Sequence, residues 1–171
     1  MADVSDMTTR QDGKNIPATQ RKQYETVHCL LLPLHKEIGL LPNASVAEIL
    51  PYSQPEPTAD APEWMLGILT WRERQLPLIS FELASQAEIG KLHRSCRIAV
   101  VNTLNGNPKL PYFGLLLQSL PSLQIVRPNT IQFIDETMPD RTAIKSIVTV
   151  NGTRAIILDL DEIEARLLAL I

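Results

Sequence analysis

The chain has 171 residues, enough for one domain or for two small lobes that share an interface. With 44% hydrophobic and 20% charged residues it has a globular composition, which excludes an intrinsically disordered chain. The net charge of −3 provides no attraction for phosphate backbones or anionic lipids, so we expect neither nucleic-acid binding nor membrane insertion. No apolar run approaches the roughly 18 residues that span a bilayer, and a cytoplasmic location is predicted.

The segment before Tyr24 differs from the rest of the chain. Residues 1–23 contain almost no large apolar side chains, so we expect a loose tail, followed by a folded domain over residues 24–171. From Tyr24 onward, short aliphatic and β-branched runs are interrupted by Pro, Gly and Asn, mostly at intervals of about 10–18 residues. This spacing predicts an all-β protein made of antiparallel barrels or a sandwich rather than βαβ units. The runs are TVHCLLLPL, EIGLLP, WMLGILTW, QLPLISF, RIAVVNTL, YFGLLLQ, LQIVRP, AIKSIVTV and TRAIILDL.

His28 and Cys29 stand in the first of these runs, and Cys96 is the second cysteine of the chain. Neither CxxC spacing nor clustered histidines occur, so no disulfide framework or zinc site is predicted, and both thiols are interpreted as small buried hydrophobic groups. Neighbours on a strand point to opposite faces, so His28 and Cys29 cannot readily form a nucleophile–base pair. No phosphate loop, hydrolase motif or metalloprotease motif is present, and no catalytic residue, metal or cofactor is expected.

Residues after Asn43 favour a short helix. The stretch SVAEIL can form a turn or two before Pro51, with Asn43 or Ser45 as the N-cap. The polar, proline-rich residues 53–62 that follow are predicted to form an exposed loop.

Residues 64–81, WMLGILTWRERQLPLISF, form the densest motif in the sequence. Two apolar strands flank the charged residues RER, which predicts a hairpin with a charged tip. Gly67 lies inside the first strand, where a glycine permits a bulge or a close approach of another backbone.

Two further signals stand near the C-terminus. Asn151-Gly152 separates two apolar runs and predicts a type I′ hairpin turn, because both residues readily adopt positive φ. The last segment, DLDEIEARLLALI, predicts a helix in which Asp161 and Glu164 resemble a capping box. Its apolar residues recur at helical spacing and should pack on the body of the protein: Leu160, Ile163, Leu167 and Ile171.

The hairpin motif resembles that of the CheW-like family, which places a glycine, an arginine and a proline where this chain has Gly67, Arg72 and Pro77. Residues 46–50, VAEIL, resemble the family's Val-x-Glu-Val/Ile segment, and the order of the downstream runs also agrees. The resemblance covers roughly residues 24–170. Thr70-Trp71 replaces the usual Asn-Leu and Glu73 replaces a glycine, a version similar to the ChpC-like accessory proteins of type IV pilus twitching systems.

The resemblance implies two small five-stranded β-barrels packed together around a hydrophobic groove, with a C-terminal helix that returns to the first barrel. It also implies a non-catalytic adaptor that couples a methyl-accepting chemoreceptor to a CheA-like histidine kinase, with twitching motility as the output. The alternatives are a small β-barrel thiol hydrolase and a nucleic-acid-binding barrel; the negative charge and the 5% aromatic content disfavour the latter.

Five residues are predicted to bind partners on the basis of this resemblance. Arg72 is the strongest candidate, since arginine is enriched at interface hot spots; its alternative is an exposed salt bridge, for instance with Glu73. Glu48 resembles part of the family's receptor-facing segment, and its alternative is the polar face of a short helix. Val46 and Ile49 could instead pack in the core. Gly67 completes the set of predicted partner-binding residues.

Overall fold

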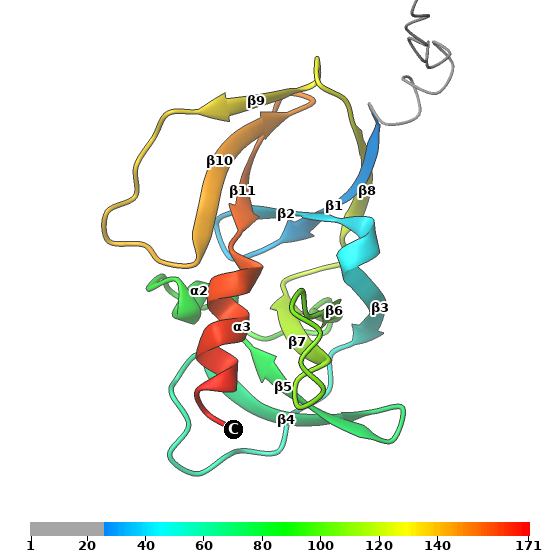
Figure 1. Cartoon of the computed structure of the whole chain (residues 1–171), viewed down its shortest axis with the longest axis vertical. Helices are drawn as coiled ribbons and strands as arrows, with labels where there is room; N and C mark the ends of the chain where they lie inside the picture. Colours follow the sequence, from blue (N-terminus) through cyan, green and yellow to red (C-terminus); the bar gives the residue numbers. More distant parts are fainter. Residues whose placement is uncertain (1–25) are drawn as a thin grey trace, which may run out of the picture.

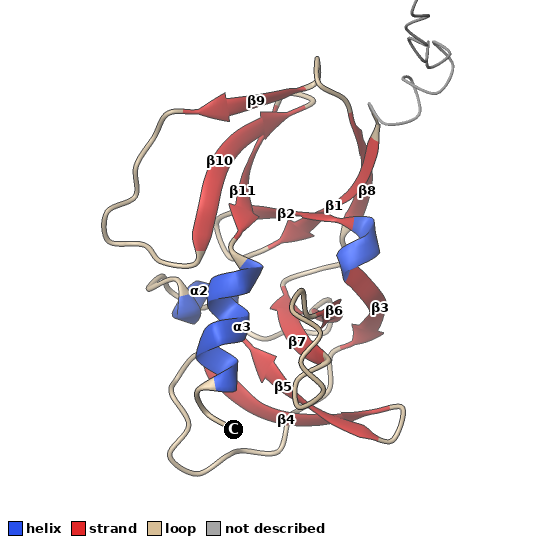
Figure 2. Ribbon diagram, viewed as in Figure 1, coloured by secondary structure: helices blue, strands red, loops and turns tan. Residues whose placement is uncertain are grey.

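The computed structural model describes residues 26–171, and the predicted loose tail over residues 1–23 lies outside this range. Strands dominate, as the sequence predicts, and they form two sheets (Figures 1 and 2). The first sheet has six strands in the order β8-β1-β2-β11-β10-β9, one more than the resemblance implies. Its strands are β1 (Val27–Pro33), β2 (Ile38–Pro42), β8 (Ser122–Val126), β9 (Ile131–Ile134), β10 (Ile144–Val150) and β11 (Thr153–Leu158).

The second sheet has five strands in the order β3-β6-β7-β5-β4. Most neighbouring strands in both sheets are antiparallel, but β11 pairs with β2 and β5 pairs with β7 in the parallel sense. The strands of the second sheet are β3 (Val46–Pro51), β4 (Met65–Trp71), β5 (Arg74–Ile79), β6 (Arg97–Asn102) and β7 (Tyr112–Leu117).

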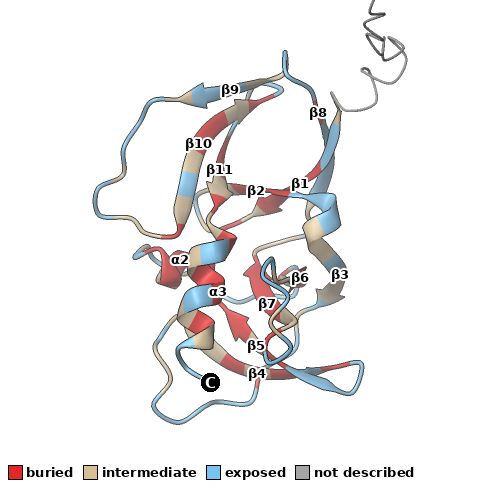
Figure 3. Ribbon diagram, viewed as in Figure 1, coloured by how far each residue is buried: buried red, intermediate tan, exposed pale blue. Residues whose placement is uncertain are grey.

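The chain begins in the first sheet, builds the whole second sheet and then returns. In Figure 1 the blue and the yellow-to-orange strands therefore lie together in the upper half, and the green strands lie in the lower half. Helix α2 (Phe81–Ala84) follows β5, and helix α3 (Leu160–Leu168) follows β11. Figure 3 shows buried positions on α3 and on the strands that it faces. The two lobes are thus not consecutive blocks of sequence, in agreement with the expectation drawn from the family.

The buried apolar side chains form three clusters. One lies within the first sheet and includes Cys29, Leu31 and Val148; a second lies within the second sheet and includes Leu78, Ile98 and Leu116. The largest cluster lies between the sheets and combines residues of both with the apolar stripe of α3. Successive residues of a strand therefore belong to different clusters, because their side chains point to opposite faces.

The helix expected over SVAEIL does not form. Asn43–Ser45 is a short 3-10 turn, labelled η1, and the next six residues are strand β3, which pairs with β6. The β-branched side chains of Val46 and Ile49 suit a strand that packs on a sheet, and this tertiary pairing outweighs the weak helical preference of so short a segment.

Helix α3 is confirmed, but its N-cap is Asp159 rather than Asp161. The Asp159 side chain accepts a hydrogen bond from the backbone N–H of Glu162 at 3.1 Å. Leu160, Ile163 and Leu167 are buried as predicted, whereas Ile171 lies beyond the end of the helix and is 65% exposed. Glu164 is fully buried and does not act as a capping residue.

Both predicted hairpins are confirmed. Asn151 and Gly152 have φ values of 47° and 82°, and they join β10 to β11 with Val150 opposite Thr153. Residues 53–62 form a loop without regular structure, apart from one isolated bridge between Glu56 and Ile68 of β4.

Candidate functional site

The predicted charged tip RER is a two-residue turn between β4 and β5, and its third residue, Arg74, is instead the first residue of β5. Trp71 pairs with Arg74, and the intervening Arg72 and Glu73 have φ values of 47° and 62°. Two successive residues in the left-handed region match the twist of the flanking strands, although the family places a glycine at the second position. The Arg72 side chain at this turn is 69% exposed.

Arg72 pairs with Glu48 of β3 rather than with its neighbour Glu73. One guanidinium nitrogen of Arg72 lies 3.0 Å from Glu48 Oε2. The same oxygen accepts a hydrogen bond from the indole nitrogen of Trp71 at 2.8 Å. The guanidinium carbon of Arg72 also lies 4.9 Å from the centroid of a Trp71 ring, in a cation–π arrangement. The structure thus brings together two of the predicted site residues, which are 24 positions apart in the sequence.

Trp71 contacts both residues of this ion pair. Its side chain is buried, with 8% exposure, and its rings meet Tyr112 of β7 edge to face at a centroid distance of 5.0 Å. Strands β3 and β4 are the two edges of the second sheet, so the contacts from Glu48 to Trp71 and Arg72 connect these edges. Sequence reasoning assigned no role to Trp71 or Tyr112. The available signal was the tryptophan at a position where the family usually has leucine.

A β-bulge at Ala47 decides which way the residues of β3 point. Val46 lies opposite Val101, and Glu48 lies opposite Val100, so Ala47 is the extra residue on this strand. Val46 and Ile49 are half-buried and pack on the cluster between the sheets. Because of the bulge, Glu48 instead lies on the face of Val100 and reaches Trp71. The three predicted residues of β3 therefore do not share one face.

Gly67 combines the two features expected of it. A register shift between Met65 and Gly67 forms a bulge against β5, and φ at Gly67 is 138°, a value that strongly favours glycine. A Cβ atom placed there would lie 2.2 Å from the carbonyl oxygen of Glu56. Gly67 thus lets the 53–62 loop approach β4, and its assignment as a partner-binding residue stays a prediction.

The cysteines lie in apolar surroundings. Cys29 is buried while His28 is exposed, so the two side chains point to opposite faces. Burial raises the pKa of the Cys29 thiol, which disfavours the reactive thiolate. Cys96 is also buried and unpaired. Residues 26–171 contain no group of three or more His, Cys, Asp or Glu side chains arranged to hold a metal ion.

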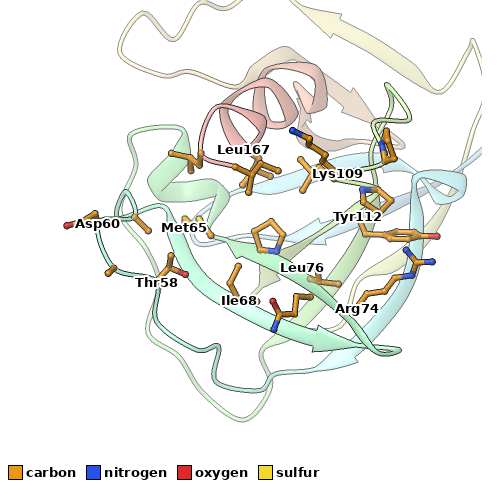
Figure 4. A pocket seen from close by; sticks show the side chains of 18 residues that line it. Thr58, Asp60, Met65, Ile68, Arg74, Leu76, Lys109, Tyr112 and Leu167 are labelled. Carbon is orange, nitrogen blue, oxygen red and sulfur yellow. The ribbon is translucent and has the colours of Figure 1, made fainter.

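A groove of about 520 Å³ lies near this site (Figure 4). Residues 58–61, the strands β4 and β5, residues 108–112 and the end of α3 line it. Its apolar lining includes Ile68, Leu76 and Leu167, while Arg74 and Lys109 contribute positive charge. Tyr112 lines the groove and also contacts Trp71, so the groove adjoins the aromatic support of Arg72.

The two packed sheets and the C-terminal helix define a small all-β fold. Residues 28–166 match the model of the CheW-like domain family. The structure is similar to that of the scaffolding protein TtCheW from Thermoanaerobacter tengcongensis, with a TM-score of 0.66 and 19% identity. That likeness covers 77% of this chain and 88% of the other. The chain therefore belongs to the CheW-like family.

Two further findings concern curated relatives and the length of the helices. A search of curated protein sequences finds no significant match. Within residues 26–171, neither helix has the length and hydropathy needed to cross a bilayer.

Proposed function

We propose that this protein is a cytoplasmic, non-catalytic adaptor that couples methyl-accepting receptors to a CheA-like histidine kinase. The observation that carries this proposal is the exposed Glu48–Arg72 ion pair on its buried aromatic support. An adaptor works through surfaces, and this surface coincides with the two charged residues at which the sequence matches the family. The ChpC-like version of the hairpin, with Trp71 before Arg72, supports twitching motility as the output.

The geometry suits recognition rather than stability. The Arg72 and Glu48 side chains are 69% and 36% exposed, and such exposed pairs contribute little to folding free energy. The indole of Trp71 nevertheless holds both groups, so little side-chain entropy remains to be lost when a partner binds. Val46 and Ile49 lie on the other face of β3 and also leave part of their apolar surface accessible. An arginine on an aromatic support matches the enrichment of arginine and aromatic residues at protein interfaces.

A charge-reversal variant at Arg72 tests binding independently of folding. Titration calorimetry measures the affinity of purified protein for the cytoplasmic tip of a methyl-accepting receptor and for the regulatory domain of a CheA-like kinase. We expect Arg72→Glu to weaken binding to at least one of them by more than tenfold, because a lost ionic hydrogen bond and a new repulsion together cost about 2–5 kcal/mol. Its thermal melting temperature should stay close to that of the parent.

The double variant Glu48→Lys/Arg72→Glu restores the intramolecular pair with reversed polarity. We expect it to melt somewhat below the parent, since a lysine at position 48 cannot accept the hydrogen bond that the Trp71 indole N–H donates to Glu48. It should bind as weakly as Arg72→Glu, because the partner meets the opposite charges. Arg154→Glu, at an exposed pair on the first sheet, is the matched control and should bind normally. If Arg72→Glu is folded and binds both partners with normal affinity, Arg72 is not part of the interface. Recovery of affinity in the double variant would show that the pair acts only within the fold.

A thiol hydrolase is the competing function. Alkylation of Cys29 would abolish the activity of such an enzyme, whereas an adaptor should show no hydrolytic activity to lose. The burial of Cys29 and the exposure of the neighbouring His28 on the opposite face of β1 favour the adaptor.

A further inference from the structure

The groove between the end of α3 and the β4–β5 hairpin is large enough for a small molecule. Its volume of about 520 Å³ lies within the roughly 300–1,000 Å³ of typical ligand sites. Strands β4 and β5 form one wall and the end of α3 forms another, while residues 58–61 and 108–112 complete the lining (Figure 4). Segments that are distant in the sequence therefore surround one concave space.

Most of the lining residues are apolar, and several of them keep accessible surface. Met65 and Ile68 of β4, Pro77 of β5 and Tyr112 of β7 are each half-buried. Leu170, just after α3, is 46% exposed. An alkyl group in the groove would remove these surfaces from water, which is favourable in proportion to the apolar area buried.

Two cationic side chains also line the groove. Arg74 of β5 and Lys109 are both exposed, and neither forms an ion pair with another of the residues 26–171. Asp60 is the single acidic side chain of the lining, and Figure 4 shows it at the opposite end of the groove from Arg74. The charges of the groove therefore suit a ligand that has one anionic group and an apolar remainder.

The backbone of the lining favours an alkyl chain over a peptide. The N–H and C=O groups of Ile68 are already bonded to Glu56, at 2.8 and 2.9 Å. The N–H of Leu110 donates to the Asn107 carbonyl at 3.0 Å, and the Leu110 carbonyl accepts from the Thr103 hydroxyl at 2.6 Å. Three further lining residues are prolines, which have no N–H group. A bound peptide would thus lose hydration of its main chain without gaining partners, whereas an alkyl chain needs none.

We propose that this groove binds a free single-chain amphiphilic carboxylate, a fatty acid anion of medium length. Its carboxylate lies at Arg74 and Lys109, and its alkyl chain lies between β4 and the end of α3. The site goes beyond the proposed adaptor function and does not depend on it. Tyr112 lines the groove and meets Trp71 edge to face, so tryptophan fluorescence should report occupancy of the groove.

Titration calorimetry and tryptophan fluorescence of the full chain with dodecanoate, kept below its micelle concentration, test the proposal. We expect saturable binding of one molecule per chain. The affinity should be about tenfold higher than that for decanoate, since each added methylene contributes about three- to fourfold. Dodecyltrimethylammonium has the same alkyl chain with a cationic head group and should bind about tenfold more weakly or less.

Two variants locate the ligand. Arg74→Glu should weaken dodecanoate binding by about tenfold or more, because an attractive charge becomes a repulsive one. Leu170→Asp should weaken it by a similar factor, because it places a carboxylate in the apolar lining. Both positions are exposed, so both variants should melt close to the parent. Lys91→Glu, at an exposed lysine outside the lining, changes the net charge equally and should bind like the parent.

The outcomes distinguish the fatty acid from other occupants of the groove. Lack of saturable binding, or parent-like binding by both groove variants, overturns the proposal. Binding to phosphatidylglycerol vesicles in preference to free dodecanoate also overturns it, since the ligand is then a membrane lipid.

A protein occupant gives a different pattern. If the parent does not bind dodecanoate and Leu170→Asp loses affinity for the receptor tip or the kinase domain, the groove holds that partner instead. A dimer that Leu170→Asp dissociates, again without dodecanoate binding, assigns the groove to a second copy of the chain. If the parent binds dodecanoate as expected but neither the receptor nor the kinase, the ligand site stands and the proposed function fails.

Discussion

Arg72 and Glu73 show how one turn can serve both structure and recognition. Left-handed backbone costs a non-glycine residue about 1–2 kcal/mol, and both turn residues adopt it. The contacts of Arg72 with Glu48 and with the indole of Trp71 offset part of this cost. The sequence located Arg72 at the tip of a hairpin, because turn position follows from the two apolar runs. It did not reveal Glu48 as the partner, because that contact depends on how the edges of the sheet meet.

Gly67 provides a prediction at the scale of one residue. We expect Gly67→Ala to lower the free energy of unfolding by about 2 kcal/mol or more, because its Cβ would overlap the Glu56 carbonyl at a backbone angle that disfavours side chains. Denaturant unfolding measures the change. Gly106→Ala is the control: φ is 61° there but nothing lies within 4 Å of the new Cβ, so only the backbone cost applies. Equal losses in the two variants would contradict the importance of the contact with Glu56.

Helix α3 and strand β3 show how far local sequence patterns predict secondary structure. The apolar spacing of α3 continues over its 9 residues, about two and a half turns, and Leu160, Ile163 and Leu167 are buried as the pattern indicates. The segment SVAEIL is too short for its pattern to distinguish a helical turn from a strand, and pairing with β6 decides in favour of the strand. The bulge at Ala47 then reverses the facing of Glu48, a change that strict alternation cannot predict.

The docking of α3 is tested by placing a charge on its packed face. Ile163→Asp and Leu167→Asp should each lower the free energy of unfolding by about 3 kcal/mol or more, since each buries an unpaired carboxylate in the cluster between the sheets. Thermal or urea unfolding provides the measurement. Leu170→Asp, on an exposed leucine after the helix, should change stability by less than about 0.5 kcal/mol. Parent-like melting of both core variants would mean that α3 does not pack as described.

At the scale of the whole molecule, Arg141 links the two halves of the chain. Its guanidinium makes hydrogen bonds of 3.1 and 2.8 Å to the two carboxylate oxygens of Glu37, in the turn between β1 and β2. It also donates to the carbonyl and hydroxyl oxygens of Ser85, which follows α2, at 2.8 Å each. The Arg141 and Glu37 side chains are only 17% and 14% exposed. Arg141 therefore connects the β1–β2 turn of the first sheet to the end of α2, the helix that follows β5 of the second sheet.

Removal of Arg141 should destabilise the whole molecule. We expect Arg141→Ala to cost about 3 kcal/mol, because it leaves the largely inaccessible Glu37 carboxylate, 14% exposed, without its partner. Arg154→Ala breaks an exposed pair with Glu136 and should cost less than about 1 kcal/mol. Chemical unfolding monitored by tryptophan fluorescence compares the two variants. Similar small losses in both would show that the Arg141 network contributes no more than a surface ion pair.

The sequence by itself determined the all-β class, the two hairpins with their turn residues, the C-terminal helix and the resemblance to the family. These features depend on residues close in the chain, through the alternation of apolar side chains, the residues of turns and helical spacing. Short segments of the sequence are therefore enough to predict them. Only the tertiary structure decided that Glu48 meets Trp71 and Arg72, that Gly67 accommodates Glu56, and that the Glu164 carboxylate accepts a hydrogen bond from the backbone N–H of Leu104. Each of these contacts joins segments 11 to 60 residues apart. They depend on bulges, on sheet curvature and on the return of the chain to its first sheet, which local patterns do not encode.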